Sequence, residues 1–234
     1  MFLCPVRLSG IFLRGLVLLV SCVVAWYVGH VLAVLIPPDV LSVAVSSIHK
    51  VALNSLMAAP APQRQRCNLC PAGTFDFQLM SGGGVKVSPS ICFKDEIIMG
   101  EGKDCTGRGI NIAAFDASSG KVFGCKSFDM WEGDNSGIMV KFLREIPNVS
   151  IILMASYDDA STKLSEEVKE EIKKLGSVEI QNIDFRSSWV FVGSKGFSLP
   201  TDLQREKINH SDKSMDKYVG WPAEVQIKGC IPHH

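Results

Sequence analysis

Side chains that commonly carry out catalysis are few in this 234-residue chain and are poorly placed for it. Histidine is the usual proton carrier near neutral pH and a frequent metal ligand, so its positions are informative. Four of the five histidines, His30, His49, His233 and His234, precede the predicted domain or end the chain, and His210 lies inside a glycosylation sequon. We therefore predict no enzymatic activity, no catalytic residues, no metal site and no cofactor.

Sequence motifs of known catalytic sites are also missing. The chain contains neither the Gly-x-Ser-x-Gly motif of serine hydrolases nor the His-Glu-x-x-His motif of zinc proteases. Residues 81–84 read Ser-Gly-Gly-Gly, but the Gly-Lys-Ser/Thr of a phosphate-binding loop does not follow, so a turn between strands is expected. Asp158 and Asp159 follow an apolar strand, where functional groups often lie, and a solvated turn is the alternative.

The amino terminus is typical of a secretory signal. Arg7 and Arg14 precede an apolar run over residues 15–28 that contains no acidic residue. We predict a signal peptide over residues 1–29, which extends to residue 33 if cleavage follows Ala33 instead. After cleavage, no membrane contact is expected.

A retained membrane anchor is the competing interpretation, since residues 11–36 are apolar enough to span a bilayer. Either interpretation places the rest of the chain in the lumen or outside the cell. Lysine plus arginine and aspartate plus glutamate number 24 each, so no basic excess exists to bind a phosphate backbone. Nucleic acid is therefore not a predicted partner.

The remainder of the chain divides into a linker or stalk and one domain. Residues 30–66 are rich in proline, alanine and serine and show little periodicity. Residues 67–234 carry the pattern of one domain with many short strands. Asn148 and Asn209 each begin an Asn-x-Ser sequon, and both are expected on surface loops if a glycan is attached.

Six cysteines lie in this domain. Cys67 and Cys70 have the spacing of a redox-active pair or of half a zinc site, but no second closely spaced pair completes four ligands. In an oxidising compartment, structural disulfides are the preferred interpretation. Six cysteines can pair in many ways, and spacing alone does not choose among them. The six are Cys67, Cys70, Cys92, Cys105, Cys125 and Cys230.

Several apolar patterns predict β-strands. Residues 109–115 and 121–128 flank a short turn-forming segment, which is the arrangement of a β-hairpin. Residues 150–157 and 188–193 are continuous apolar runs, typical of strands that are buried on both faces. A final, half-exposed strand is expected over residues 223–228, where apolar and polar residues alternate.

Two helices are also predicted. Ser165 can cap a helix whose first turn is acidic and whose end carries two lysines and Gly176. A second helix is expected from about residue 136 to residue 146, with Pro147 as its stop. Strands that precede and separate these helices without regular alternation predict an α+β, β-rich domain with antiparallel sheets.

Short motifs lie along the domain at residues 108–111, 128–134, 157–159, 175–177, 185–191, 220–224 and 229–232. Together they resemble the interleukin-like EMT inducer family, across essentially all of residues 67–232. The resemblance implies a secreted, cytokine-like protein of the endocrine pancreas that influences insulin secretion, glucose and lipid metabolism and islet-cell survival. It also implies two antiparallel sheets that pack as a sandwich and are flanked by short helices.

The same resemblance implies a disulfide frame that pairs Cys67 with Cys92 and Cys70 with Cys230. Family members usually have more residues between the first two cysteines than the two found here. Cys105 and Cys125 lie outside this frame. They either form a third disulfide or remain as free or intermolecular thiols.

The domain is also similar to the GG-type lectin domain in the stem of a Golgi N-acetylglucosaminyltransferase. There, sugar is held by an arginine of an Arg-Gly-Ile motif, an acid after the central strand and an arginine of an Arg-x-x-Trp motif. The matching positions are Arg108, Asp158 and Arg186. Charged groups form strong, directional hydrogen bonds to hydroxyls, so these three residues are candidates to bind a glycan. The alternative is an internal Arg-Asp-Arg ion-pair network that braces the sheets, and Trp189 is expected in the core.

These inferences predict a secreted, non-enzymatic signalling protein that acts on a cell-surface receptor, with glycans as candidate further partners. The alternative is a Golgi-anchored carbohydrate-binding protein that assists a glycosylation enzyme, which requires the amino-terminal segment to be retained.

Overall fold

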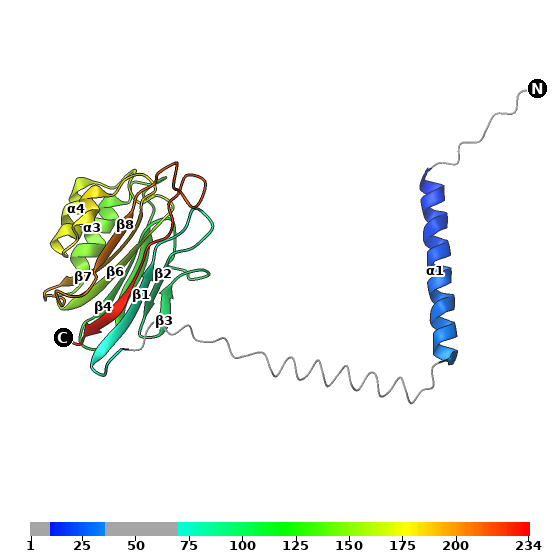
Figure 1. Cartoon of the computed structure of the whole chain (residues 1–234), viewed down its shortest axis with the longest axis horizontal. Coiled ribbons are helices and arrows are strands. Elements are labelled where there is room, and N and C mark those ends of the chain that lie inside the picture. Colours follow the sequence, from blue (N-terminus) through cyan, green and yellow to red (C-terminus); the bar gives the residue numbers. More distant parts are fainter. Residues whose placement is uncertain (1–9, 36–69) are drawn as a thin grey trace, which may run out of the picture. The chain divides into compact units, whose positions relative to one another are not determined.

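The computed structural model describes residues 10–35 and 70–234 (Figure 1). The chain divides into two units, Met1–Pro62 and Gln63–His234. Most of the predicted linker over residues 30–66 lies outside the described residues.

The described part of the first unit is one helix, α1 (Gly10–Leu35). Both predicted cleavage points, after Gly29 and after Ala33, fall within this helix. Over the residues that the structure describes, no helix is at once long and apolar enough to cross a membrane.

Two antiparallel sheets form the framework of the second unit, which confirms the predicted α+β, β-rich fold. One sheet consists of β1 (Thr74–Met80), β2 (Ser90–Phe93), β3 (Glu96–Met99) and β9 (Gln226–Pro232), in the order β3-β2-β1-β9. The other consists of β4 (Gly109–Asp116), β5 (Val122–Phe128), β6 (Ser150–Tyr157), β7 (Ser188–Lys195) and β8 (Glu206–Asn209), in the order β5-β4-β6-β7-β8.

Both faces of the five-stranded sheet are buried, one against the four-stranded sheet and the other against helices, and a hydrophobic core lies on each face. Between the two sheets, Phe77 of β1 packs in one cluster with Phe115 of β4. On the other face lie α3 (Ser136–Glu145) and α4 (Glu166–Lys174), as Figure 1 shows, and the core beneath them contains Trp189. Trp189 is fully buried, so its predicted place in the core is confirmed. Because both faces of the sheet are buried, its central strands are apolar on both faces.

The predicted local elements are largely confirmed. β4 and β5 form the expected hairpin, and the carboxylate of Asp116 accepts hydrogen bonds from Ser118 and Ser119 in its turn. Ser165 caps α4, because its Oγ accepts a hydrogen bond from the Val168 N–H at 3.4 Å. α3 ends at Glu145, just before the predicted proline stop.

The predicted position of the last strand is wrong by three residues at its start. β9 begins at Gln226, because Val225 is held by Ser81 through two hydrogen bonds of 3.0 Å and does not join the ladder. The strand then continues past residue 228 and pairs along β1 as far as Pro232, which lies opposite Thr74. The glycine-rich segment that begins at Ser81 is the expected connection between strands, and it is buried rather than solvated.

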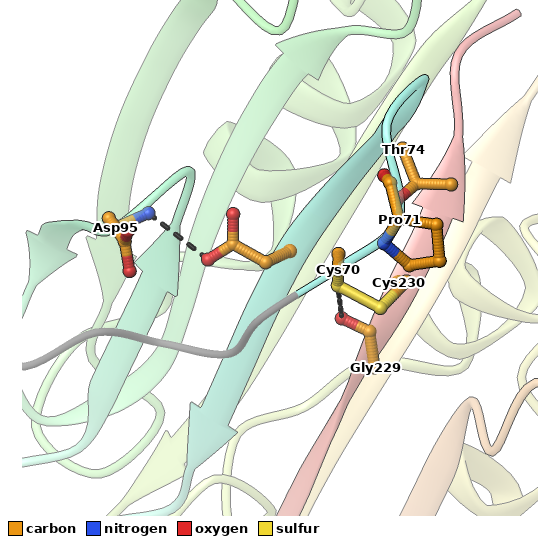
Figure 2. The surroundings of a disulfide bond; sticks show 7 residues. Cys70, Pro71, Thr74, Asp95, Gly229 and Cys230 are labelled. Atoms are coloured by element: carbon orange, nitrogen blue, oxygen red, sulfur yellow. Dashed lines mark hydrogen bonds between the residues drawn. A yellow bond between two sulfur atoms is a disulfide. The ribbon is translucent and has the colours of Figure 1, made fainter.

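Two disulfides fasten the described part of this unit. Cys70 is bonded to Cys230 in β9, which is the pairing that the family resemblance implies (Figure 2). The bridge spans 160 residues, and a loop of this length corresponds to about 5 kcal/mol in the chain-entropy model. Cys105 is bonded to Cys125 of β5 and forms the third disulfide considered above. The expected partner of Cys92 is residue 67, which lies outside the described residues, so that pairing stays a prediction.

Candidate functional site

The three candidate glycan-binding residues lie at one end of the five-stranded sheet. Arg108 directly precedes β4 and Asp158 directly follows β6. Because these strands are antiparallel, with Gly109 opposite Tyr157, the start of one meets the end of the other. Arg186 lies two residues before β7, which is the antiparallel neighbour of β6 on its other side. The sheet topology therefore gathers three residues that are far apart in the sequence.

A close backbone approach at Gly109 positions Arg108. Gly109 has a φ of +94°, and a Cβ atom there would lie 1.9 Å from the carbonyl oxygen of Phe128. A side chain at this position would collide with backbone, so only glycine allows β4 to approach residues 128–130 so closely. This approach brings Asp129 within reach of the arginine.

Arg108 forms ion pairs with two acidic residues other than Asp158. Its Nε and Nη2 donate to Oδ2 of Asp129 at 3.1 and 2.7 Å, and Nη2 lies 2.9 Å from Glu132. Hydrogen bonds to Asp129 and Glu132 raise the pKa of Arg108. Burial by itself would raise the pKa of Asp129, but the hydrogen bonds from Arg108 and from two backbone N–H groups outweigh it and hold this pKa below its usual value. The guanidinium group is therefore permanently charged and fixed in orientation.

The neighbouring aspartates after β6 have different roles. Asp159 is buried, and its carboxylate accepts hydrogen bonds from the backbone N–H groups of Ser161, Thr162 and Arg186. It thereby orders two loops at this end of the sheet. Asp158 is half-exposed, and its Oδ1 accepts a hydrogen bond of 3.0 Å from the Trp221 indole N–H. Of these two aspartates, only Asp158 lines a cavity, and the alternative of a solvated turn does not hold for Asp159.

Arg186 is held by aromatic rings. Its guanidinium carbon lies 3.7 Å from the ring centroid of Trp221 and 4.7 Å from that of Phe185. Its Nη1 donates to the Gly220 carbonyl at 3.4 Å. Among the residues that the structure describes, no ion pair joins Asp158 to either arginine, so the Arg-Asp-Arg bracing network considered from the sequence is wrong. Instead, Trp221 contacts both residues, because its N–H is bonded to Asp158 and its ring stacks on Arg186.

An open cavity of about 320 Å³ lies in front of this arrangement, and it is lined by Val85, Arg108, Asp129, Tyr157 and Asp158. Two of the three candidate residues thus line one cavity. Arg186 is not in its lining, and it reaches this site only through Trp221, which contacts both Asp158 and Arg186.

The backbone at two of the candidate residues is strained. Asp158 has a φ of +60° and Arg186 a φ of +62°, and five non-glycine residues in the described chain adopt such values. A left-handed conformation costs an L-residue about 1 kcal/mol or more, and such strain tends to persist at functional sites. Two of these five strained positions therefore lie at this end of the five-stranded sheet.

The two predicted glycosylation acceptors differ in accessibility. Asn148 is exposed in the turn before β6, as expected. Asn209 is the last residue of β8 and is half-buried, and its amide donates to the Ala223 carbonyl at 3.2 Å. The expectation of a surface loop is therefore wrong for Asn209, because the chain continues in the sheet up to this residue.

A serine, a histidine and an aspartate do meet in the fold, but not as a catalytic triad. Ser187 Oγ lies 3.1 Å and Asp184 Oδ2 lies 3.6 Å from the same atom, Nδ1 of His210. A triad needs the serine on one ring nitrogen and the acid on the other. In the described chain, no group of three or more potential metal ligands is found.

Sequence reasoning missed Trp221 and Asp129 as parts of this site. Both lie in motifs that carried the family resemblance, at residues 220–224 and 128–134, which was the available signal. Their contacts with Asp158 and Arg108 depend on the tertiary fold.

Comparison with known proteins agrees with this description. A sequence profile of the family described as interleukin-like EMT inducer matches residues 108–197, which include all three candidate residues. Protein FAM3B of Homo sapiens is 46% identical over 228 residues, which cover 96% of this chain and 97% of the relative. Protein FAM3A of Homo sapiens is 36% identical over 97% of both chains, and protein FAM3C of Rattus norvegicus is 40% identical over 77% of this chain and 80% of its own. Since identity at this level extends over nearly the whole length, the chain belongs to the interleukin-like EMT inducer family of cytokine-like proteins.

Proposed function

We propose that this protein is a secreted, non-enzymatic signalling protein that recognises a glycan on a cell-surface receptor. The observation that carries the proposal is the cavity in which Arg108 and Asp158 present fixed charges, beside the Trp221–Arg186 stack. Small-ligand sites are concave and contain a few polar groups that are fixed in position, and Arg108 and Asp158 are such groups in this cavity.

The chemistry of these groups suits sugar hydroxyls. Oδ1 of Asp158 is engaged by Trp221, which leaves Oδ2 to accept a hydrogen bond from a hydroxyl. The rings of Trp221 and Phe185 lie against the Arg186 guanidinium and its Nη1 donates to the Gly220 carbonyl, so the remaining N–H groups are left to donate to a ligand. Because the stack fixes these groups in advance, binding would cost little further side-chain entropy.

The amino-terminal signal pattern supports secretion, as do the disulfides, which persist in oxidising compartments. From the family resemblance, we expect the protein to influence insulin secretion, glucose and lipid metabolism, and islet-cell survival. The apolar segment would be removed after Gly29 or Ala33. Sequencing of the amino terminus of the protein from culture medium tests this step, and an intact terminus found only in membranes would favour the Golgi-anchored alternative.

Glycan-array binding of the secreted protein tests the proposed function. Wild type is compared with Arg186→Ala and with Asp158→Asn, after circular dichroism has shown that all three are folded. We expect binding by wild type, a loss of at least about tenfold in both variants, and wild-type binding by the control Arg144→Ala, whose side chain is exposed on α3. Equal binding by wild type and Arg186→Ala, or no binding by either, would contradict the proposal and leave a protein surface as the receptor's target.

A further inference from the structure

A second cavity, of about 480 Å³, adjoins the first. The two share Val85 in their linings, and the second is also lined by Trp221, whose indole N–H is bonded to Asp158 of the first cavity. Both volumes fall in the range of small-ligand sites, roughly 300–1,000 Å³. A ligand of two or more sugar units could therefore extend from one cavity into the other.

The two cavities differ in charge. The first is lined by Arg108, Asp129 and Asp158, which carry one positive and two negative charges. The second is lined by Lys86 and Lys217 and by no acidic residue. Glu224 lies outside this lining and pairs with Lys217, so the net positive charge at the second cavity comes from Lys86, although the whole chain has equal numbers of basic and acidic residues.

The two lysines differ in whether an acidic residue pairs with them. Lys217 Nζ lies 2.7 Å from Oε2 of Glu224, and hydrogen bonds to Glu224 and Tyr218 raise the pKa of Lys217, so it stays protonated and fixed in place. Lys86 is exposed and forms no ion pair with any residue that the structure describes. Its charge remains available for an anionic ligand.

Glycines shape the floor of the second cavity. A Cβ atom at Gly83 would lie 2.5 Å from Glu224 Oε1 and 2.8 Å from Tyr218 Oη. A side chain at Gly83 would displace the Tyr218–Glu224 pair, and Glu224 in turn holds Lys217. The rings of Tyr218 and Trp221 add apolar surface of the kind that packs on a sugar ring.

We propose that the second cavity binds the anionic group, a carboxylate or a sulfate, of an acidic glycan whose adjacent neutral sugar occupies the first cavity. This inference rests on the proposed function and names its ligand class. Lys86 supplies the uncompensated positive charge for the anion and Lys217 supplies a fixed N–H donor, while Arg108 and Asp158 bind the hydroxyls of the neutral unit.

The test uses an array of glycans in which each core is present in a neutral, a sialylated and a sulfated form, for example lactose, 3′-sialyllactose and 3′-sulfolactose. The full secreted protein is compared with Lys86→Gln, Lys217→Gln and two controls. Lys121→Gln removes the same charge in the turn at the opposite end of β4. Lys103→Gln removes it from a neighbouring cavity of about 450 Å³ that Lys86 also lines.

For at least one core, we expect an acidic form to bind about tenfold tighter than the neutral form, with a preference that weakens as salt is raised. Lys86→Gln and Lys217→Gln should each reduce this preference to within about threefold while the neutral core binds as before, and both controls should keep it. The comparison of sialylated with sulfated forms identifies the anion.

Two outcomes would overturn the inference and leave the proposed function intact. One is binding that Arg186→Ala abolishes but that is equal for neutral and acidic forms of every core. The other is a preference that Lys103→Gln removes and Lys217→Gln does not, which would put the anion in the neighbouring cavity. Absence of binding to every glycan would overturn both proposals.

Discussion

The indole N–H of Trp221 donates a hydrogen bond of 3.0 Å to Oδ1 of Asp158, from a loop that approaches the end of β6. The same indole ring also stacks on Arg186, whose guanidinium carbon lies 3.7 Å from the ring centroid. One aromatic side chain therefore orients two candidate ligand-binding groups that form no ion pair with each other. Removing parts of this side chain separates the two effects.

Trp221→Phe keeps an aromatic face for Arg186 but removes the N–H that orients Asp158. We expect glycan affinity to fall about threefold to tenfold, since one hydrogen bond to a charged group is lost, with a change in Tm of only a few degrees. Titration followed by NMR against the strongest array ligand measures this. Phe123→Leu, at an exposed ring on β5 outside both cavities, is the control. Wild-type affinity in Trp221→Phe would show that Asp158 needs no orientation by the indole.

Gly109→Ala should destabilise the domain by about 3 kcal/mol or more, because a methyl group would meet the Phe128 carbonyl oxygen at 1.9 Å in a left-handed backbone conformation. Gly102→Ala is a matched control, since Gly102 also has a positive φ, of +72°, but nothing lies within 4 Å of its Cβ position. It should lose only about 1 kcal/mol. Urea denaturation measures both values, and equal losses would mean that the contact at Gly109 is relieved by a backbone shift.

Lys195 fastens the end of α3 to the sheet. Its Nζ donates to the carbonyl oxygens of Leu143, Arg144 and Ile146 at 3.1, 2.9 and 2.6 Å. These carbonyls have no partner within the helix, and the positive charge also complements the helix dipole. Lys195→Met should lower the free energy of unfolding by about 2 kcal/mol.

The control for this variant is Lys173→Met on α4, whose exposed ion pair with Glu170 should contribute no more than about 0.5 kcal/mol. Both are measured from the midpoint of urea denaturation at a common slope. If the two variants lose equal stability, the three carbonyl contacts of Lys195 have no special weight.

The Arg108–Asp129 pair predicts a pH dependence of stability. The pKa of Asp129 is lower in the folded protein than in the unfolded chain, so its carboxylate contributes stability that is fully present above the unfolded value, about 4, and is lost as the pH falls through the folded value. Asp129→Asn should therefore cost about 1 kcal/mol at pH 7, and this difference from wild type should shrink steadily below about pH 4.

Urea denaturation of wild type and Asp129→Asn from pH 7 to pH 2.5 tests this dependence. Asparagine can still accept hydrogen bonds from the backbone N–H groups of Trp131 and Glu132, so the loop is expected to keep its shape. Asp202→Asn, at an exposed position, should match wild type throughout. A difference for Asp129→Asn that is the same at pH 7 and pH 2.5 would show that charge is not its cause.

Much of the fold could be predicted from local patterns. The cap at Ser165, the turn that begins at Asp116 and the apolar runs of β6 and β7 lie where the sequence indicates them, because capping, turn chemistry and burial act over a few residues. The alternation of Phe75, Phe77 and Leu79 in β1 is a local signal of the same kind. The start of β9 was misplaced, since a distant serine decides whether Val225 joins the ladder.

The sequence by itself determined the β-rich class, the family and three candidate ligand-binding residues, and it predicts a secretory signal at the amino terminus. Only the tertiary structure decided their partners: Arg108 pairs with Asp129, and Trp221 stands between Asp158 and Arg186. The physical reason is that secondary structure responds to neighbours a few residues apart, whereas an ion pair or an aromatic stack depends on which strand ends the sheet topology brings within about 4 Å. Charge and residue type alone do not contain that information.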